Sequence, residues 1–177
     1  MIQPKYFCKS LDQLAKEVLP KVYYEHYGVA GLQQMDERVL ITLDNLSKNL
    51  EIEYGRKIAL TVNSWSWGGN RNQSGLRTRE FYNSESDYVS SRSQHKYGRG
   101  CDLVAKGLTP HDVRKHVIEN KDKYPDISFL EVGPLKDGSA MSWVHFDVRM
   151  RLDNDAIKYW SPKLKYVSEE VVLKDEL

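Results

Sequence analysis

Two histidines and one aspartate in this chain have the types and the spacing of a metal-binding site. His95 and Asp102 lie on either side of a turn that contains Gly98 and Gly100, and His145 follows in a second segment. Glycine lets the chain reverse sharply, so both side chains can reach one ion. Two imidazoles and a carboxylate are three protein ligands for zinc, and catalytic zinc sites leave the fourth position open for water.

The segment around His145 is predicted to be a strand whose two faces differ in chemistry. Alternate side chains of a strand share a face, so Trp143, His145 and Asp147 point one way and three apolar residues point the other. The apolar face belongs in the core, and the other face suits the wall of a cleft. The same alternation turns Asp102 toward the cleft and its neighbour Cys101 into the core.

An ordinary structural interpretation competes with metal binding for each histidine. Taken alone, His95 is typical of a loop residue and His145 of a core histidine with its hydrogen bonds satisfied. The joint pattern favours a shared site, because the spacing also matches the motif of a known family.

That motif is Ser-x-His-x-x-Gly-x-Ala-x-Asp, followed downstream by a strand that carries Trp-x-His. Glycine stands at position 100, where the motif usually has alanine. The other positions of the motif are all matched in this chain: Ser93, His95, Gly98, Asp102, Trp143 and His145. On these residues the chain resembles the zinc D-alanyl-D-alanine carboxypeptidases and the phage L-alanyl-D-glutamate endopeptidases, to which the hedgehog signalling domain is distantly related. The resemblance covers roughly residues 35–150. It implies a hedgehog-like zinc peptidase fold in which His95, Asp102 and His145 hold Zn²⁺.

The catalytic base is less clearly marked than the metal ligands. Many members of the family place a glutamate three residues before the last histidine ligand, where this chain has Ser142. Other branches take the base from the preceding strand, which makes Glu131 the candidate here and Asp147 the alternative. A carboxylate near a zinc-bound water can accept its proton. Glu131 equally fits a solvent-exposed strand end.

Substrate binding is assigned to three residues near the motif: Arg77, Ser93 and Trp143. Several family members hold a substrate carboxylate with an arginine that precedes the Ser-x-His motif, and the planar guanidinium suits this by forming two hydrogen bonds. Arg77 in Ser-Gly-Leu-Arg is the candidate. The other arginines of this loop remain alternatives, or are solvated charges: Arg71, Arg79 and Arg92.

Length and composition predict one ordinary globular domain. The 177 residues are 40% hydrophobic and 29% charged, and Lys+Arg of 26 against Asp+Glu of 25 leaves a net charge of +1. This balance argues against a nucleic-acid partner bound through bulk charge. Nothing approaches the apolar run of about 18 residues that a membrane span needs. The first residues do not have the pattern of a secretory signal, so we expect synthesis in a cytoplasm.

The periodicity predicts an α+β domain, with helices packed on a mainly antiparallel sheet and a zinc site in a cleft. It comprises residues 1–177, with a helical extension at 1–30 and a further extension at 151–177. Helices are expected over residues 10–19, 34–50, 109–120 and near 154–160. Strands are expected over 57–62, 100–105, 127–132 and 142–150, with an edge strand near 164–173. The polar segment 63–94 is long for a loop, which favours a functional role.

The leading hypothesis from these observations is a zinc-dependent peptidase of the D,D-carboxypeptidase or endopeptidase type, acting on peptidoglycan peptides. We expect a monomer, with no nucleic acid and no membrane as partner. A phage-encoded lysis or wall-remodelling protein fits, acting at the cell wall after release or as part of a virion. The alternative is a zinc-stabilised binding or virion structural module of the same fold that has lost catalysis, as Ser142 would allow.

Overall fold

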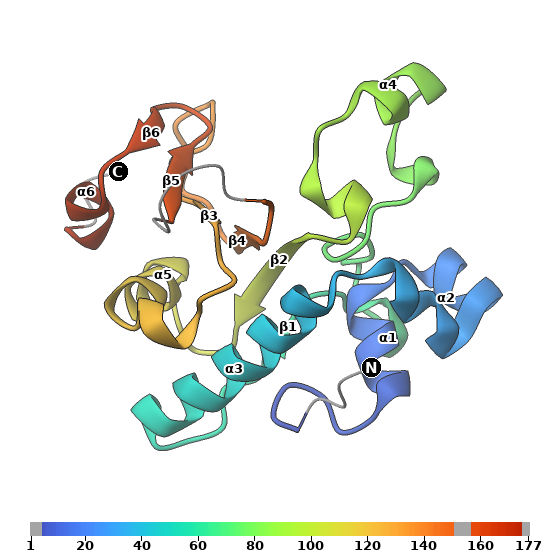
Figure 1. Ribbon diagram of the computed structural model, residues 1–177, viewed down its shortest axis with the longest axis horizontal. Coiled ribbons are helices and arrows are strands. Elements are labelled where there is room, and N and C mark those ends of the chain that lie inside the picture. The colour runs from blue at the N-terminus through green and yellow to red at the C-terminus, as the bar shows by residue number, and fades with distance from the viewer. Residues whose placement is uncertain (1–4, 151–156, 175–177) are drawn as a thin grey trace.

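The computed structural model describes residues 5–150 and 157–174, which form an α+β domain. Short 3-10 turns separate several of the helices, and Figure 1 shows their arrangement. Within the described residues the α-helices are α1 (Leu11–Val18), α2 (Lys21–Tyr27), α3 (Glu37–Tyr54), α4 (Glu85–Ser90), α5 (Pro110–Glu119) and α6 (Glu169–Leu173). None of these helices combines the length and the apolar character that crossing a bilayer requires.

A mainly antiparallel sheet runs through the middle of the domain in the order β1-β2-β4-β3-β5-β6. Its strands are β1 (Leu60–Thr61), β2 (Gly100–Ala105), β3 (Phe129–Glu131), β4 (Val144–Asp147), β5 (Lys158–Ser161) and β6 (Lys165–Val167). Every neighbouring pair is antiparallel except β3 and β5, which are parallel. The predicted fold class is confirmed at this level.

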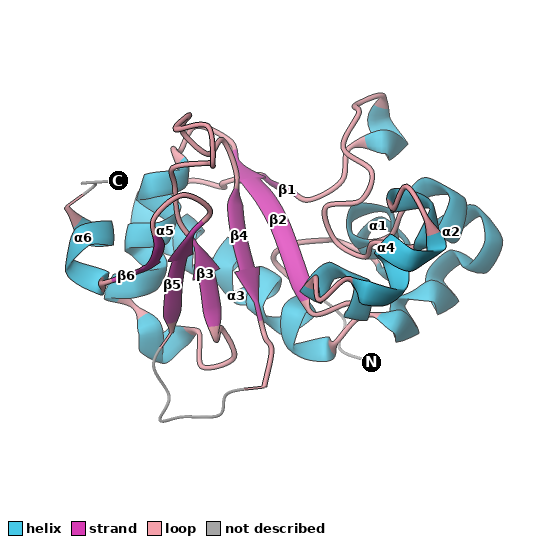
Figure 2. Ribbon diagram, turned by 90° about the horizontal axis from the view of Figure 1, so that it is seen from above, coloured by secondary structure: helices cyan, strands magenta, loops and turns pink. Residues whose placement is uncertain are grey.

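The hydrophobic core lies on one face of this sheet. In Figure 2 helices α3 and α5 lie behind the strands, whose other face is turned toward the viewer. The α3 residues Val39, Leu43, Leu46 and Leu50 recur at three- and four-residue steps and are buried in the core cluster. Cys101 of β2 is fully buried in the same cluster, which confirms that it faces the core.

Local signals account for the helix ends. Asp36 accepts a hydrogen bond from the backbone of Arg38 at the start of α3, which therefore begins after a 3-10 turn rather than at residue 34. Thr109, which precedes Pro110, forms a reciprocal capping box with Asp112 in the first turn, so α5 begins where the sequence predicts.

Two predictions near the C-terminus were wrong. Residues 158–161 form strand β5, whereas a helix was expected near 154–160, and the remainder of that helix lies outside the described residues. The predicted strand 164–173 is a strand only at Lys165–Val167. Ser168 then caps the short helix α6 by accepting a hydrogen bond from the Val171 backbone.

The long segment 63–94 is anchored to the domain at several points. Arg71 donates hydrogen bonds to the carbonyl oxygens of Val62 and Asp102. Gly75 packs so closely on α1 that a Cβ there would lie 2.2 Å from the Val18 carbonyl oxygen. Because the segment is held on both sides, it can position residues beside the sheet.

Candidate metal centre

Three carboxylate and imidazole side chains lie side by side on the face of the sheet away from the core. Asp102 of β2 is directly opposite His145 of β4, and His145 is directly opposite Glu131 of β3. Directly opposed residues have their Cβ atoms about 4.5–5.5 Å apart and on the same face. The row continues through Trp160 of β5 to Tyr166 of β6. Strand register therefore brings together residues from distant parts of the sequence.

His95 reaches the same place from a 3-10 turn at Gln94–Tyr97. Gly98 ends this turn with a positive φ of 65°, a conformation that glycine adopts without a steric penalty. Its backbone N–H donates to the His95 carbonyl oxygen at 3.2 Å. The turn leaves the His95 side chain 2% exposed and pointing at the row on the sheet.

The side chains of His95, Asp102 and His145, here called the His–Asp–His cluster, converge closely enough to hold a metal ion. His95 Nε2 lies 3.1 Å from His145 Nδ1 and 3.3 Å from Asp102 Oδ1. His145 Nδ1 lies 2.7 Å from Asp102 Oδ1. Ligand atoms about 2.0–2.1 Å from a tetrahedral zinc ion stand about 3.3 Å apart, so the donor set and its spacing fit this ion.

Contacts outside the cluster orient each of its members. His95 Nδ1 is 2.7 Å from the Gly75 carbonyl oxygen, which can only accept, so Nδ1 carries the hydrogen and the Nε2 lone pair faces the cluster. Arg77 donates from Nη2 to Asp102 Oδ2 at 2.7 Å, which leaves Oδ1 turned inward. Metal-binding sites commonly have such supporting hydrogen bonds.

Protonation of the cluster reflects burial and mutual attraction. Burial alone would lower the pKa of His145, but hydrogen bonds and charge from Asp102 and Asp147 outweigh it and raise the pKa to about 9. Burial opposes ionisation of Asp102, yet the two histidines hold the pKa of its carboxyl well below the usual range. The dominant effect on His95 is burial, which lowers its pKa. A bound cation would take the place of the proton shared here.

Glu131 lies beside the cluster and is half-buried in the same hollow. Burial raises the pKa of its carboxyl, helped by the nearby charge of Asp102 and opposed by His145. The carboxylate makes no hydrogen bond to another residue of the described ranges. A carboxylate with a raised pKa and no fixed partner suits a group that accepts and releases a proton.

Asp147, the alternative base, lies behind His145 rather than in the hollow. Its side chain is fully buried, and Oδ2 is 3.5 Å from His145 Nε2, on the side of the imidazole away from the cluster. Arg149 donates from Nε to Asp147 Oδ1 at 2.7 Å and pairs with the carboxylate through Nη2 as well. This placement suits a residue that orients His145.

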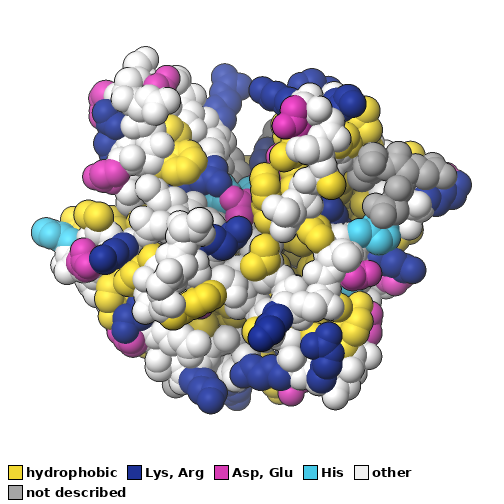
Figure 3. All heavy atoms as spheres, turned by 180° about the vertical axis from the view of Figure 1, so that it is seen from behind, with side chains coloured by type: hydrophobic (Ala, Val, Ile, Leu, Met, Phe, Trp, Pro, Cys, Tyr) yellow, Lys and Arg dark blue, Asp and Glu magenta, His cyan; other side chains and the backbone are white. Residues whose placement is uncertain are grey.

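The hollow above the cluster, here called the sheet hollow, has a volume of about 500 Å³. Arg77, Ser93 and Trp143, the predicted substrate-binding residues, all line it. Figure 3 shows acidic, basic and histidine side chains gathered in a depression between two lobes of the surface. Sequence reasoning missed five of the lining residues: Gln94, Phe129, Arg149, Trp160 and Tyr166. The adjacent aromatic residues Tyr159 and Trp160, a residue type enriched in strands, could have indicated the strand that carries Trp160.

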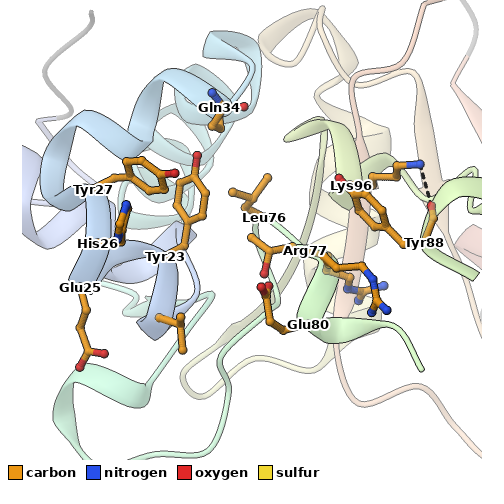
Figure 4. A pocket seen from close by; sticks show the side chains of 13 residues that line it. Tyr23, Glu25, His26, Tyr27, Gln34, Leu76, Arg77, Glu80, Tyr88 and Lys96 are labelled. Carbon is orange, nitrogen blue, oxygen red and sulfur yellow. Dashed lines mark hydrogen bonds between the residues drawn. The ribbon is translucent and has the colours of Figure 1, made fainter. Parts of the chain in front are cut away.

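A second hollow, here called the tyrosine hollow, has a volume of about 630 Å³ and shares Arg77 with the first. Figure 4 shows Tyr23 and Tyr27 of α2 on one side and Tyr88 and Lys96 on the other. Among the described residues, the His–Asp–His cluster is the one group of three or more such side chains close enough to hold a metal ion, and it does not line this second hollow.

No protein-family model, curated protein or solved structure matches this chain. The candidate metal centre rests on its own residues: a row fixed by strand register, a histidine held in place by a glycine-terminated turn, and supporting contacts to each member of the cluster.

Proposed function

We propose that this protein is a zinc-dependent peptidase that hydrolyses amide bonds in peptidoglycan stem peptides, within the carboxypeptidase and endopeptidase group that its motifs resemble. The observation that carries the proposal is the convergence of His95 Nε2, Asp102 Oδ1 and His145 Nδ1 within 3.3 Å of one another, beside a carboxylate that can act as a base. A donor set of two imidazoles and one carboxylate selects zinc in preference to magnesium or calcium, which prefer oxygen ligands alone.

The chain's residues divide the chemistry among them. Zinc held by the cluster would supply Lewis acidity and would lower the pKa of a bound water to about 7. Glu131 accepts the proton from the attacking water on its carboxylate, because its strand places it next to His145. It then delivers that proton to the leaving amine nitrogen, so that the amide bond breaks into a carboxylate and an amine.

Substrate positioning is proposed for residues at the edges of the sheet hollow. Arg77 shares its guanidinium with Asp102, so it can link a substrate carboxylate electrostatically to the cluster. Ser93 and Trp143 offer a hydroxyl and an aromatic surface on the same wall. The protein would act as a monomer at the cell wall, after release from a cell or as a component of a virion.

A catalytically inactive module is the second candidate, and Ser142 is the observation that favours it. Ser142 is exposed and stands where the resembling family often has its catalytic glutamate. In that case the metal would stabilise the fold around the cluster, and the sheet hollow would bind wall peptides without cleaving them.

Mass spectrometry of muropeptides tests the proposal directly. Zinc-loaded protein is incubated with purified cell walls, and new amino and carboxyl termini are sought with and without a chelator. We expect cleavage that depends on metal and falls by about 10²-fold or more in Glu131→Gln, the range that general-base catalysis contributes. Glu119→Gln, an exposed change on α5, is the matched control.

The two candidates predict different results from this experiment. Cleavage that persists after complete metal removal would overturn the zinc mechanism. Metal binding without new termini, together with binding of wall peptides by both variants, would favour the inactive module. Equal rates for Glu131→Gln and wild type would remove Glu131 as the base.

A further inference from the structure

Two large aromatic residues extend the row of the metal centre to the edge of the sheet. Trp160 is opposite Glu131, and Tyr166 is opposite Trp160. Both line the sheet hollow. Their neighbours along each strand, Tyr159 and Val167, lie on the other face, where Tyr159 joins the core. The core therefore does not account for Trp160 and Tyr166.

The two rings differ from isolated exposed aromatics, which are common on protein surfaces. Tyr166 lies directly opposite Trp160 on the β5–β6 hairpin, yet it is not packed against it closely enough to be buried and remains 71% exposed. The Trp160 ring is held from one side by Phe129, at 6.2 Å between ring centroids, and the Lys165 ammonium lies 5.7 Å from its centroid. Phe129 is also 6.2 Å from the His145 ring. Phe129 itself is buried, with the Arg149 guanidinium 4.0 Å from its centroid, so the aromatic surface open to a ligand begins at Trp160 and ends at Tyr166 on the edge strand.

The strand spacing fixes how far the Trp160 and Tyr166 backbones lie from that of His145 in the candidate metal centre. Adjacent strands are about 4.8 Å apart, so the Trp160 backbone lies about 10 Å from that of His145 and the Tyr166 backbone about 14 Å away. One or two extended residues, at about 3.3–3.6 Å each, would bridge much of the first distance. A group bound on the rings would therefore be covalently close to the amide at the cluster.

The chemistry of the surface selects its ligand. Tryptophan and tyrosine present flat apolar faces and one polar atom each, and the neighbouring Lys165 adds a hydrogen-bonding group beside Trp160. A sugar ring has the complementary character, with an apolar face of C–H groups and hydroxyls around its edge. Acidic peptide side chains would gain little from the ring faces themselves, and Arg77 at Asp102 offers them a cation at the other end of the row.

We propose that Trp160 and Tyr166 form a saccharide subsite, so that the amide presented to the His–Asp–His cluster is one near the glycan end of the stem peptide. This inference rests on the proposed function and deepens it. The stem peptide joins the glycan through a lactyl ether on an amino sugar. A sugar on the rings then places the first amide bonds of the peptide, rather than its C-terminal bond, over the cluster.

Two measurements test the subsite, and the first needs no hydrolysis. Binding of N-acetylglucosamine tetramer to the zinc-loaded protein is measured by calorimetry for wild type, Tyr166→Ala and Tyr54→Ala. Tyr54 is a partly exposed tyrosine at the end of α3, 37% exposed and outside both hollows, so it is a matched control. We expect binding that weakens about tenfold in Tyr166→Ala, as for loss of an aromatic hot spot, and is unchanged in the control.

The second measurement compares hydrolysis of a disaccharide-linked stem peptide with that of the same peptide without sugar. Tyr166→Ala and Trp160→Phe should raise KM for the sugar-linked substrate several-fold and leave the free peptide within about twofold, a pattern that loss of a hairpin contact alone would not produce. New termini should appear near the glycan.

The outcomes separate the subsite from the peptidase activity. Peptide hydrolysis without tetramer binding overturns the subsite and leaves the proposed function standing. Tetramer binding that depends on Tyr166, in a protein that cleaves nothing, supports the saccharide subsite and overturns the peptidase. Equal KM changes on both substrates would show that the rings contact peptide, and would overturn the saccharide assignment.

Discussion

Asp147, the alternative base, lies behind His145 instead of in the sheet hollow. It is fully buried, paired with Arg149, and 3.5 Å from the imidazole nitrogen of His145 that faces away from the cluster. Carboxylates in this position fix the orientation of a ligating histidine, and removing them commonly costs 10–100-fold in metal affinity, an order-of-magnitude range. We therefore expect Asp147→Asn to weaken zinc binding by about 10–100-fold, measured by competition with a chromophoric chelator.

Asp122→Asn serves as the control for this change, because Asp122 is an exposed residue in the turn after α5. Thermal unfolding of both variants without metal would report any loss of fold. A folded Asp147→Asn protein with unchanged zinc affinity would contradict the orienting role.

Glu131 carries a prediction about pH. Burial raises its pKa, and a general base works only when deprotonated, so activity should fall as pH falls through this raised value. The acid limb of kcat/KM should therefore lie above about 4.3, the ordinary pKa of glutamate. The measurement is hydrolysis of a stem peptide between about pH 4 and 8, with zinc content determined at each pH to exclude metal loss. Full activity with bound zinc at the lowest pH would argue against Glu131.

Elements differ in how well the sequence predicted them. The alternation around His145 predicted which side chains face the core, and the expected start of α5 agrees with the structure, because strand alternation and helix capping are both local signals. Strand register is not local. The alignment of Glu131 with His145 depends on the connection between β3 and β4, and only the structure shows that Asp102, His145 and Glu131 form one row.

Strand β5 shows why the remaining error arose. Short apolar segments fit helix and strand patterns equally well, and Ile157 and Tyr159 are both buried two residues apart. Pairing with β3 on one side and β6 on the other settles the conformation of residues 158–161. The sequence therefore predicted which residues form the His–Asp–His cluster but not the aromatic end of the hollow.

The glycine that ends the His95 turn offers a test at the scale of the element. A Cβ on Gly98 would lie 2.0 Å from the Gln34 carbonyl oxygen, whereas a Cβ on Gly55 meets nothing within 4 Å. Both glycines have positive φ, 65° and 61°. Gly55→Ala should cost about 1–2 kcal/mol of unfolding free energy through backbone strain alone. Gly98→Ala should cost clearly more and should also weaken zinc binding, as measured by urea unfolding and metal titration. Equal costs would show that the contact with Gln34 relaxes freely.

At the scale of the molecule, the two faces of the sheet have different roles: one packs in the hydrophobic core, and the other carries the candidate site. One face carries the core with α3 and α5, and the other carries the cluster, Glu131 and the aromatic row. Buried polar groups on the second face need partners, and without metal they bond to one another, as His145 does to Asp102. The metal-free and zinc-bound proteins should therefore depend on pH in opposite ways.

Without metal, the pKa of His145 in the folded protein is raised from 6.5 to about 9. A raised folded-state pKa gives stability that is present below about pH 6.5 and is lost as pH rises toward 9. His95, whose pKa is lowered in the folded protein, has the opposite sign: it adds a small rise in stability as its unfolded form loses its proton near pH 6.5, and adds no slope well above that pH. Zinc needs the neutral imidazole, so stability in zinc should hold or rise over the same range. Urea unfolding at pH 7 and 9, with chelator and with zinc, measures both slopes. A metal-free protein equally stable at the two values would show that His145 is neutral there, and that the Asp102 contact does not depend on its charge.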